Sequence, residues 1–208
     1  KEKLLPDLSK NIVNGNSLIG TDILNSSLVL PFNKEPVPNL IREEETGGVG
    51  LDELKLKPMD FDKTFPEIMK SGGFDAIVGN PPYVLSRETM DNPTKEYYSN
   101  HYATIWEKPN TFNLFLERGY SLTKERGFLS YIIPNSWLTI EACKLSRKLF
   151  ISERSLKTID DLNYGVFNNV GVEPLILVMT KNSASNNVHY RRLFSKEDFK
   201  NKYLAYDQ

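Results

Sequence analysis

Residues 74–84 read FDAIVGNPPYV, and this stretch decides the fold. The apolar run FDAIV is typical of a buried β-strand. Neither Pro81 nor Pro82 can donate a backbone hydrogen bond, so the strand cannot continue through them. It therefore ends near Gly79 and leaves a tetrad, Asn-Pro-Pro-Tyr at residues 80–83, at its carboxyl end. Open α/β sheets bind ligands at the carboxyl ends of their strands, so the tetrad is either a strand-ending turn or part of a site.

The groups of the tetrad suit a planar amine. The Asn80 side-chain oxygen can accept from one N–H of the amine and the Pro81 carbonyl from the other. Proline rings hold both acceptors in place, and Tyr83 offers a flat face on which a planar ring can stack. Two acceptors draw an amine nitrogen toward sp³ geometry, so its lone pair can attack a methyl donor without a strong base. The residues describe a pocket for an aromatic amine such as an adenine taken out of a duplex.

Outward from the tetrad, strand and helix patterns alternate along the chain. Strands are predicted at residues 11–15, 74–79, 128–133, 156–162 and 174–180, and helices at 61–72, 111–124 and 137–153, the second of them capped by Asn110 or Thr111. This alternation favours a mostly parallel α/β sheet with right-handed crossovers. The connection 163–173 is short enough for the last two strands to pair antiparallel at a sheet edge.

The composition fits a globular cytoplasmic protein. The 208 residues are 39% hydrophobic and 25% charged, with a formal net charge of −1. No apolar run approaches the ~20 residues that a membrane helix needs. One cysteine and two histidines exclude an internal disulfide framework and argue against a dedicated transition-metal site. We therefore expect no membrane partner and no metal.

The stretch 74–84 resembles the catalytic motif of the adenine-N6 DNA methyltransferases of restriction–modification systems, in the branch fused to or paired with a type II (IIS/IIG-like) endonuclease. The resemblance covers nearly all of residues 10–181. It implies a Rossmann-like class I methyltransferase sheet with an antiparallel last strand. It further implies S-adenosylmethionine as the methyl donor and double-stranded DNA with a flipped adenine as the substrate. The implied partners are a fused or associated restriction endonuclease and a specificity domain.

The resemblance also assigns roles to residues outside the tetrad. The implied cofactor contacts are Asn16, Ser17, Asn80, Pro82 and Phe115. Phe167, on a polar loop, matches an aromatic that stacks on the flipped base opposite Tyr83. A turn-forming role for Asn16 and a core role for Phe115 remain open as alternatives. Pro134, Asn135 and Trp137 resemble a motif that shapes the pocket wall, and they can equally be structural.

Two family features are missing from the chain. We find neither the Gly-rich turn that cradles the methionine part of the cofactor nor the acidic residue for its ribose. Residues 1–183 are therefore predicted to be a partial S-adenosylmethionine-dependent methyltransferase domain, incomplete on its N-terminal side, with insertions at 21–60 and 85–110. Residues 184–208 are predicted to be a linker toward a missing target-recognition region. The cofactor site is expected to be incomplete, and this chain by itself inactive.

Three other functions are compatible with the residues. The same tetrad occurs in protein glutamine-N5 methyltransferases, and a related one in some RNA methyltransferases. A non-catalytic DNA-binding fragment of a restriction system is the third alternative. It relies on basic and aromatic residues that could line a DNA groove: Arg87, Lys95, Tyr97, Tyr98, His101, Tyr102, Lys108, Arg118, Lys124 and Arg126.

Overall fold

The computed structural model describes residues 11–22, 56–83, 92–105, 110–163, 166, 172–183 and 187–198. Contacts divide the chain into two units, Lys1–Thr64 and Phe65–Gln208. Each unit is described by itself. Within the described residues, no helix is long and apolar enough to cross a membrane.

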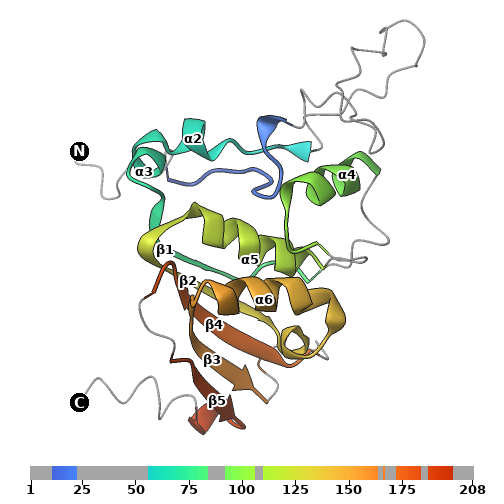
Figure 1. Ribbon diagram of the computed structural model, residues 1–208, viewed down its shortest axis with the longest axis vertical. Coiled ribbons are helices and arrows are strands. Elements are labelled where there is room, and N and C mark those ends of the chain that lie inside the picture. The colour runs from blue at the N-terminus through green and yellow to red at the C-terminus, as the bar shows by residue number, and fades with distance from the viewer. Residues whose placement is uncertain are drawn as a thin grey trace, which may run out of the picture. The chain divides into compact units, whose positions relative to one another are not determined.

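The second unit is built on a five-stranded mixed sheet (Figure 1). Its strands are β1 (Phe74–Gly79), β2 (Thr123–Pro134), β3 (Leu156–Leu162), β4 (Pro174–Thr180) and β5 (His189–Leu193), in the spatial order β1-β2-β4-β3-β5. The pairs β1–β2 and β3–β5 are parallel, whereas β4 is antiparallel to both of its neighbours. The predicted antiparallel pairing of residues 156–162 with 174–180 is confirmed. The sheet is not mostly parallel as predicted, because β4 also pairs antiparallel with β2.

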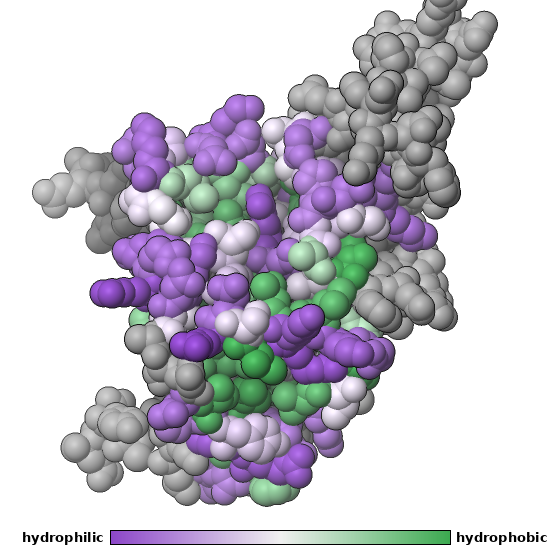
Figure 2. Space-filling model, in the orientation of Figure 1, coloured by the Kyte–Doolittle hydropathy of each residue, from purple (hydrophilic) through white to green (hydrophobic). Residues whose placement is uncertain are grey.

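The helices of the second unit are α3 (Pro66–Lys70), α4 (Asn92–His101), α5 (Thr111–Leu122) and α6 (Lys144–Ser152), with 3-10 turns at Asn135–Leu138 and Glu141–Cys143. Of these helices, α5 and α6 contribute side chains to the core on the sheet. The core joins Phe112 and Leu116 of α5 and Phe150 of α6 to Ile133 and Leu177 of the sheet. In Figure 2, hydrophobic residues gather around α6 and the adjoining part of the sheet. The amphipathic helix predicted at 111–124 forms because this apolar side of α5 is buried on the sheet.

The position of β4 differs from the prediction. We expected the last antiparallel pair at a sheet edge, but β4 lies between β2 and β3. Its sequence, PLILVMT, is apolar at nearly every position, as befits a strand with neighbours on both sides. The single helix predicted at 137–153 is also divided, because two 3-10 turns precede α6.

Residues 189–193 lie in the segment expected to be a linker, yet they form β5. Asp160 and Asp161 of β3 are both almost fully buried. Arg191 binds Asp160 through Nε and a second guanidinium nitrogen, and Arg192 Nε lies 3.3 Å from Asp161 Oδ2. Adjacent charges on neighbouring strands therefore match each other, and this match fixes the register of β5 on β3.

The turn before β1 depends on two glycines. Gly72 and Gly73 follow α3 with φ of 96° and 118°, a region that other residues rarely adopt. A Cβ at Gly73 would clash with the carbonyl oxygen of Leu122. The predicted helix stop at this glycine pair is confirmed, although the helix predicted at 61–72 is split into α2 (Phe61–Thr64) and α3 before Pro66.

The described part of the first unit comprises residues 11–22 and 56–64. The strand predicted at 11–15 is wrong: pairing is limited to one parallel bridge between Asn16 and Pro58. Asn16 N donates to Lys57 O at 2.7 Å, and Met59 N donates to Ile19 O at 2.8 Å. Pro58 has no N–H to extend a ladder, so the contact stays an isolated bridge.

Candidate active site

The tetrad lies directly after β1, where β2 continues past it. The last register pair of β1 and β2 is Gly79 with Tyr131, whereas β2 runs on to Pro134. The backbone of β2 beyond Tyr131 is therefore unpaired on the side of β1. The tetrad turns into this space at the carboxyl end of the strand, as predicted from the prolines.

Two acceptors of the tetrad are unengaged. Asn80 is exposed, and no described residue hydrogen-bonds its carboxamide. Likewise, no described residue donates to the carbonyl of Pro81. The next carbonyl differs, because Pro82 O accepts from Thr111 Oγ1 at 2.6 Å. The tetrad thus has two acceptors that no described residue engages, one on the exposed Asn80 and one on the buried Pro81, next to a third that Thr111 occupies.

Tyr83 is held at both ends of its side chain. Its hydroxyl donates to Ile132 O at 3.1 Å, on the unpaired stretch of β2. Its ring meets Phe112 edge to face, with 6.2 Å between centroids. Burial raises the pKa of the Tyr83 hydroxyl, so the hydroxyl stays protonated and continues to donate near neutral pH. A ring fixed in this way is a preorganised stacking surface.

The first turn of α5 supports the tetrad. Asn110 is the N-cap, and its side-chain oxygen accepts from Phe112 N at 3.3 Å. We expected Asn110 or Thr111 in this role, and the structure assigns it to Asn110. Thr111 is buried, and its hydroxyl reaches back to Pro82. The start of α5 therefore contacts the tetrad through the Thr111 hydroxyl and the Phe112 ring.

The remaining predicted site residues fall into three groups. Phe167 lies outside the described residues. Phe115 is partly buried against the core cluster, in the same unit as the tetrad. Asn16 and Ser17 belong to the other unit. The Asn16 side-chain oxygen accepts from Leu18 N at 3.1 Å, which is the turn-forming role kept open as an alternative.

These residues fit S-adenosylmethionine in part. Asn80 and Pro82 are exposed, and Phe115 keeps part of its surface exposed, so the three can contact a bound cofactor. The carboxamide oxygen of Asn16 is already used by its own turn. Among the described residues, no group of three or more His, Cys, Asp or Glu side chains could hold a metal ion.

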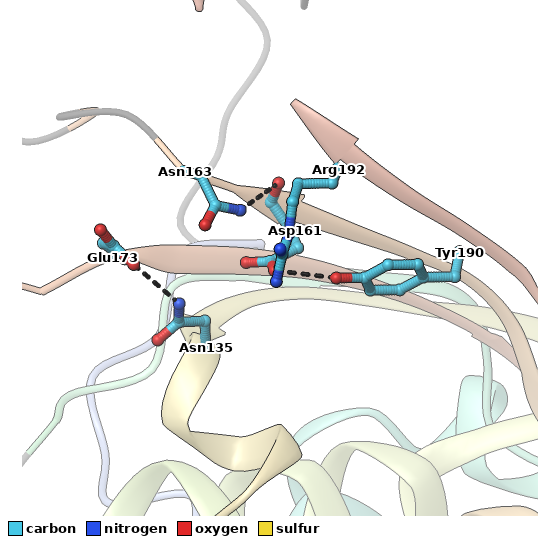
Figure 3. Close-up of polar contacts among 6 residues, drawn as sticks. All are labelled: Asn135, Asp161, Asn163, Glu173, Tyr190 and Arg192. Atoms are coloured by element: carbon cyan, nitrogen blue, oxygen red, sulfur yellow. Dashed lines mark hydrogen bonds and ion pairs between the residues drawn. The ribbon is translucent and has the colours of Figure 1, made fainter. Parts of the chain in front are cut away.

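A second polar cluster follows the carboxyl ends of β2 and β3 (Figure 3). Asn135 Nδ2 donates to Glu173 Oε2 at 3.1 Å. Asp161 accepts from the Tyr190 hydroxyl at 3.0 Å, and its other oxygen is buried without a hydrogen-bond partner. Of the residues proposed for the pocket wall, Trp137 is buried and donates to Ser146 Oγ at 2.9 Å, so its role is structural.

The tyrosines of the predicted DNA groove lie inside the protein. Tyr97, Tyr98 and Tyr102 are all buried, and Tyr98 and Tyr102 meet edge to face. Burial raises the pKa of Tyr102. The backbone amides of Ala103 and Thr104 donate to Glu117 of α5 at 2.9 Å each, which anchors this segment. These rings pack the protein and are not available to stack on DNA. Of the basic residues in the same list, Arg87 and Lys108 lie outside the described residues.

The chain also matches a known protein family. The model of the Eco57I restriction-modification methylase family matches residues 21–167. The chain belongs to this family. The match contains the tetrad, Thr111 and the whole of α5 and β2, so the site described above lies in the part of the chain that defines membership.

Two curated relatives of this methylase carry informative names. The type II restriction enzyme and methyltransferase RM.Eco57I of Escherichia coli is 28% identical over 210 residues, which is 97% of this chain and 18% of the relative. The adenine-specific methyltransferase BrxX, from E. coli O9:H4, is 26% identical over 48% of this chain and 8% of its own length. The chain therefore spans less than a fifth of either relative.

A solved structure shows the same fold. The methyltransferase subunit of a type I restriction-modification system from Streptococcus thermophilus aligns with a TM-score of 0.52 and 18% identity, over 74% of this chain and 35% of that one. The second unit thus shares the fold of a methyltransferase subunit, as the resemblance implied.

Sequence reasoning missed one contact of this candidate site. Thr111 had been considered only as a helix cap, although its hydroxyl binds a tetrad residue 29 positions earlier. The available signal was the position of two polar residues, Asn110 and Thr111, just before an apolar helix. Only one of them is needed as the N-cap, so the side chain of the other is available for a different contact.

Proposed function

We propose that this chain forms part of the site that methylates the exocyclic N6 amine of adenine in DNA, within a restriction–modification enzyme that uses S-adenosylmethionine. The observation that carries the proposal is the pair of unengaged acceptors, Asn80 Oδ1 and Pro81 O, on a rigid turn at the carboxyl end of β1. Family membership and the name of the BrxX relative support it.

The chemistry follows from the two acceptors. An exocyclic amine has two N–H groups, and its lone pair is delocalised into the ring. Acceptance of both hydrogens by Asn80 and Pro81 favours a pyramidal nitrogen, whose lone pair is free to attack a carbon as that carbon's bond to its leaving group breaks. The methylated nitrogen then loses one of its two protons, which passes to solvent beside the exposed Asn80. S-adenosylmethionine, when bound, supplies a methyl group on a sulfonium, an electrophile that needs no further activation. Tyr83 offers the surface on which the purine stacks, each stack being worth about 1–3 kcal/mol.

A labelling experiment with the full-length protein tests this function. Labelled S-adenosylmethionine is offered with duplex DNA, with RNA or with a peptide-chain release factor, the last two representing the alternative substrates of the tetrad. Digestion of the DNA to nucleosides should place the label in N6-methyladenine. Label found in the release factor, in RNA or in a methylated cytosine would refute the proposal.

The pH dependence gives a second prediction. Asn80 and the Pro81 carbonyl do not titrate, and burial raises the pKa of Tyr83 above the ordinary value of a tyrosine hydroxyl. The folded-state Tyr83 therefore stays neutral wherever the free side chain is neutral. We expect the single-turnover methylation rate to be independent of pH between about 6 and 9. A rate that rises tenfold per pH unit in this interval would require a general base and contradict the mechanism.

A further inference from the structure

We propose that Thr111 is a positioning residue for methyl transfer, because its hydroxyl fixes the one backbone torsion that the two prolines of the tetrad leave free. The proposal rests on the proposed function for its kinetic consequence. Its structural content, the hydrogen bond from Thr111 Oγ1 to Pro82 O, stands on its own.

Within the two-proline segment of the tetrad, every torsion is restricted but one. The rings of Pro81 and Pro82 lock φ at both residues. The torsion ψ of Asn80 and that of Pro81 are each restricted because a proline follows. The described part of the chain contains no cis peptide bond. The torsion ψ of Pro82 has no such restriction, since Tyr83 follows it. This torsion sets both the direction of the Pro82 carbonyl and the path of the chain into Tyr83.

Thr111 holds this carbonyl from the first turn of α5. The oxygen–oxygen distance of 2.6 Å is that of a strong hydroxyl–carbonyl hydrogen bond. Thr111 is buried, so water does not replace the bond readily. The neighbouring Phe112 contacts the ring of Tyr83. The first turn of α5 therefore sets the torsion that orients Tyr83. It also supports the Tyr83 ring in that orientation.

The function of this arrangement is to separate the acceptors of the tetrad. The Pro82 carbonyl is turned to the protein, while Asn80 Oδ1 and Pro81 O are left open. Without the Thr111 hydroxyl, ψ of Pro82 loses its restraint, and the position of Tyr83 relative to these two acceptors depends only on its contacts with Ile132 and Phe112. An amine could still be bound, but the stacked ring would no longer hold it in line with both acceptors.

Two substitutions of Thr111 distinguish the positioning effect of its hydroxyl from the packing of its side chain. Thr111→Val keeps the shape of the side chain and removes the hydroxyl, whereas Thr111→Ser keeps the hydroxyl. In the full-length protein we expect Thr111→Val to lower kcat about 10- to 100-fold, the scale of a small misplacement of reacting groups, with the KM for DNA within about threefold of wild type. Thr111→Ser should retain kcat within about threefold.

Thr123→Val is the matched control, because Thr123 is a buried threonine whose hydroxyl donates to the Gly119 carbonyl at 2.8 Å, at the opposite end of α5. It should leave kcat unchanged. Hydrogen–deuterium exchange supplies a readout that needs no substrate. The tetrad has only two backbone amides, those of Asn80 and Tyr83, and exchange at Tyr83 should accelerate in Thr111→Val alone.

The outcomes are distinguishable. Unchanged kcat and unchanged exchange at Tyr83 in Thr111→Val would overturn the positioning role, and so would an equal loss of kcat in Thr123→Val. If the wild-type protein methylates something other than adenine, the proposed function fails, whereas the exchange comparison still decides whether Thr111 holds the tetrad.

Discussion

Asn80→Ala should abolish adenine methylation while leaving DNA affinity largely intact. The substitution removes one of the two acceptors that no described residue engages. The Pro81 carbonyl alone cannot accept hydrogen bonds from both N–H groups of an amine. Loss of one preorganised hydrogen-bonding group at a reacting centre costs about 10²- to 10³-fold in rate. We expect a loss of at least that size in the single-turnover methylation rate of the full-length protein, measured with labelled cofactor and saturating DNA.

The rate loss should come without unfolding or loss of binding. Asn80 is exposed and its carboxamide contacts no described residue, so alanine leaves no buried group unsatisfied. Asn100→Ala, at an exposed position on α4, is a control that changes the same kind of side chain away from the tetrad. A rate for Asn80→Ala within threefold of this control would refute the assignment of Asn80.

The features predicted most accurately from the sequence are those that local chemistry determines. Strands β3 and β4 match their predicted bounds, and β4 does so because it is an apolar run that begins at a proline and ends before a polar segment. The end of β1 was predicted because proline has no N–H to donate, whatever the tertiary context. The Asn110 cap depends on its own first turn of helix, and it was also within reach of local reasoning.

The errors arose where tertiary contacts decide. Tyr97, Tyr98 and Tyr102 occur in a polar segment, so their burial against the rest of the unit could not be read from composition. The bond from Thr111 to Pro82 joins positions 29 residues apart. The predicted strand at 11–15 had the right residue types, but a strand also needs a partner ladder, and in the described residues only the bridge at Pro58 is present.

The segment 189–193 shows how one pairing changes an interpretation. Its sequence, HYRRL, has exposed polar positions typical of a linker or an edge strand. The acidic pair on β3, 31 residues earlier, decides between a linker and an edge strand. Asp160 is fully buried, and a buried carboxylate is tolerated only when it is paired and hydrogen-bonded. The arginines of β5 meet this requirement, so the strand docks at the edge of the sheet.

Arg191→Ala should therefore destabilise the sheet strongly. It removes both guanidinium contacts to Asp160, whose side chain has no exposure to solvent, while the Arg191 side chain is 27% exposed. Breaking a buried ion pair from one side costs about 3–5 kcal/mol, and the partial exposure of Arg191 places the expected loss near the lower value, about 3 kcal/mol. Native-state hydrogen exchange of the β3 amides in the full-length protein measures the change in opening free energy.

Lys144→Ala is the matched control for this prediction. It removes a salt bridge to Glu141 in which both side chains are more than 60% exposed, and such surface pairs contribute about 0–1 kcal/mol. The difference between the two variants isolates the effect of burial. If Arg191→Ala changed the exchange of β3 no more than Lys144→Ala does, the ion pair would not be what holds β5 on the sheet. Its docking would then rest on backbone pairing and on the buried side chain of Leu193.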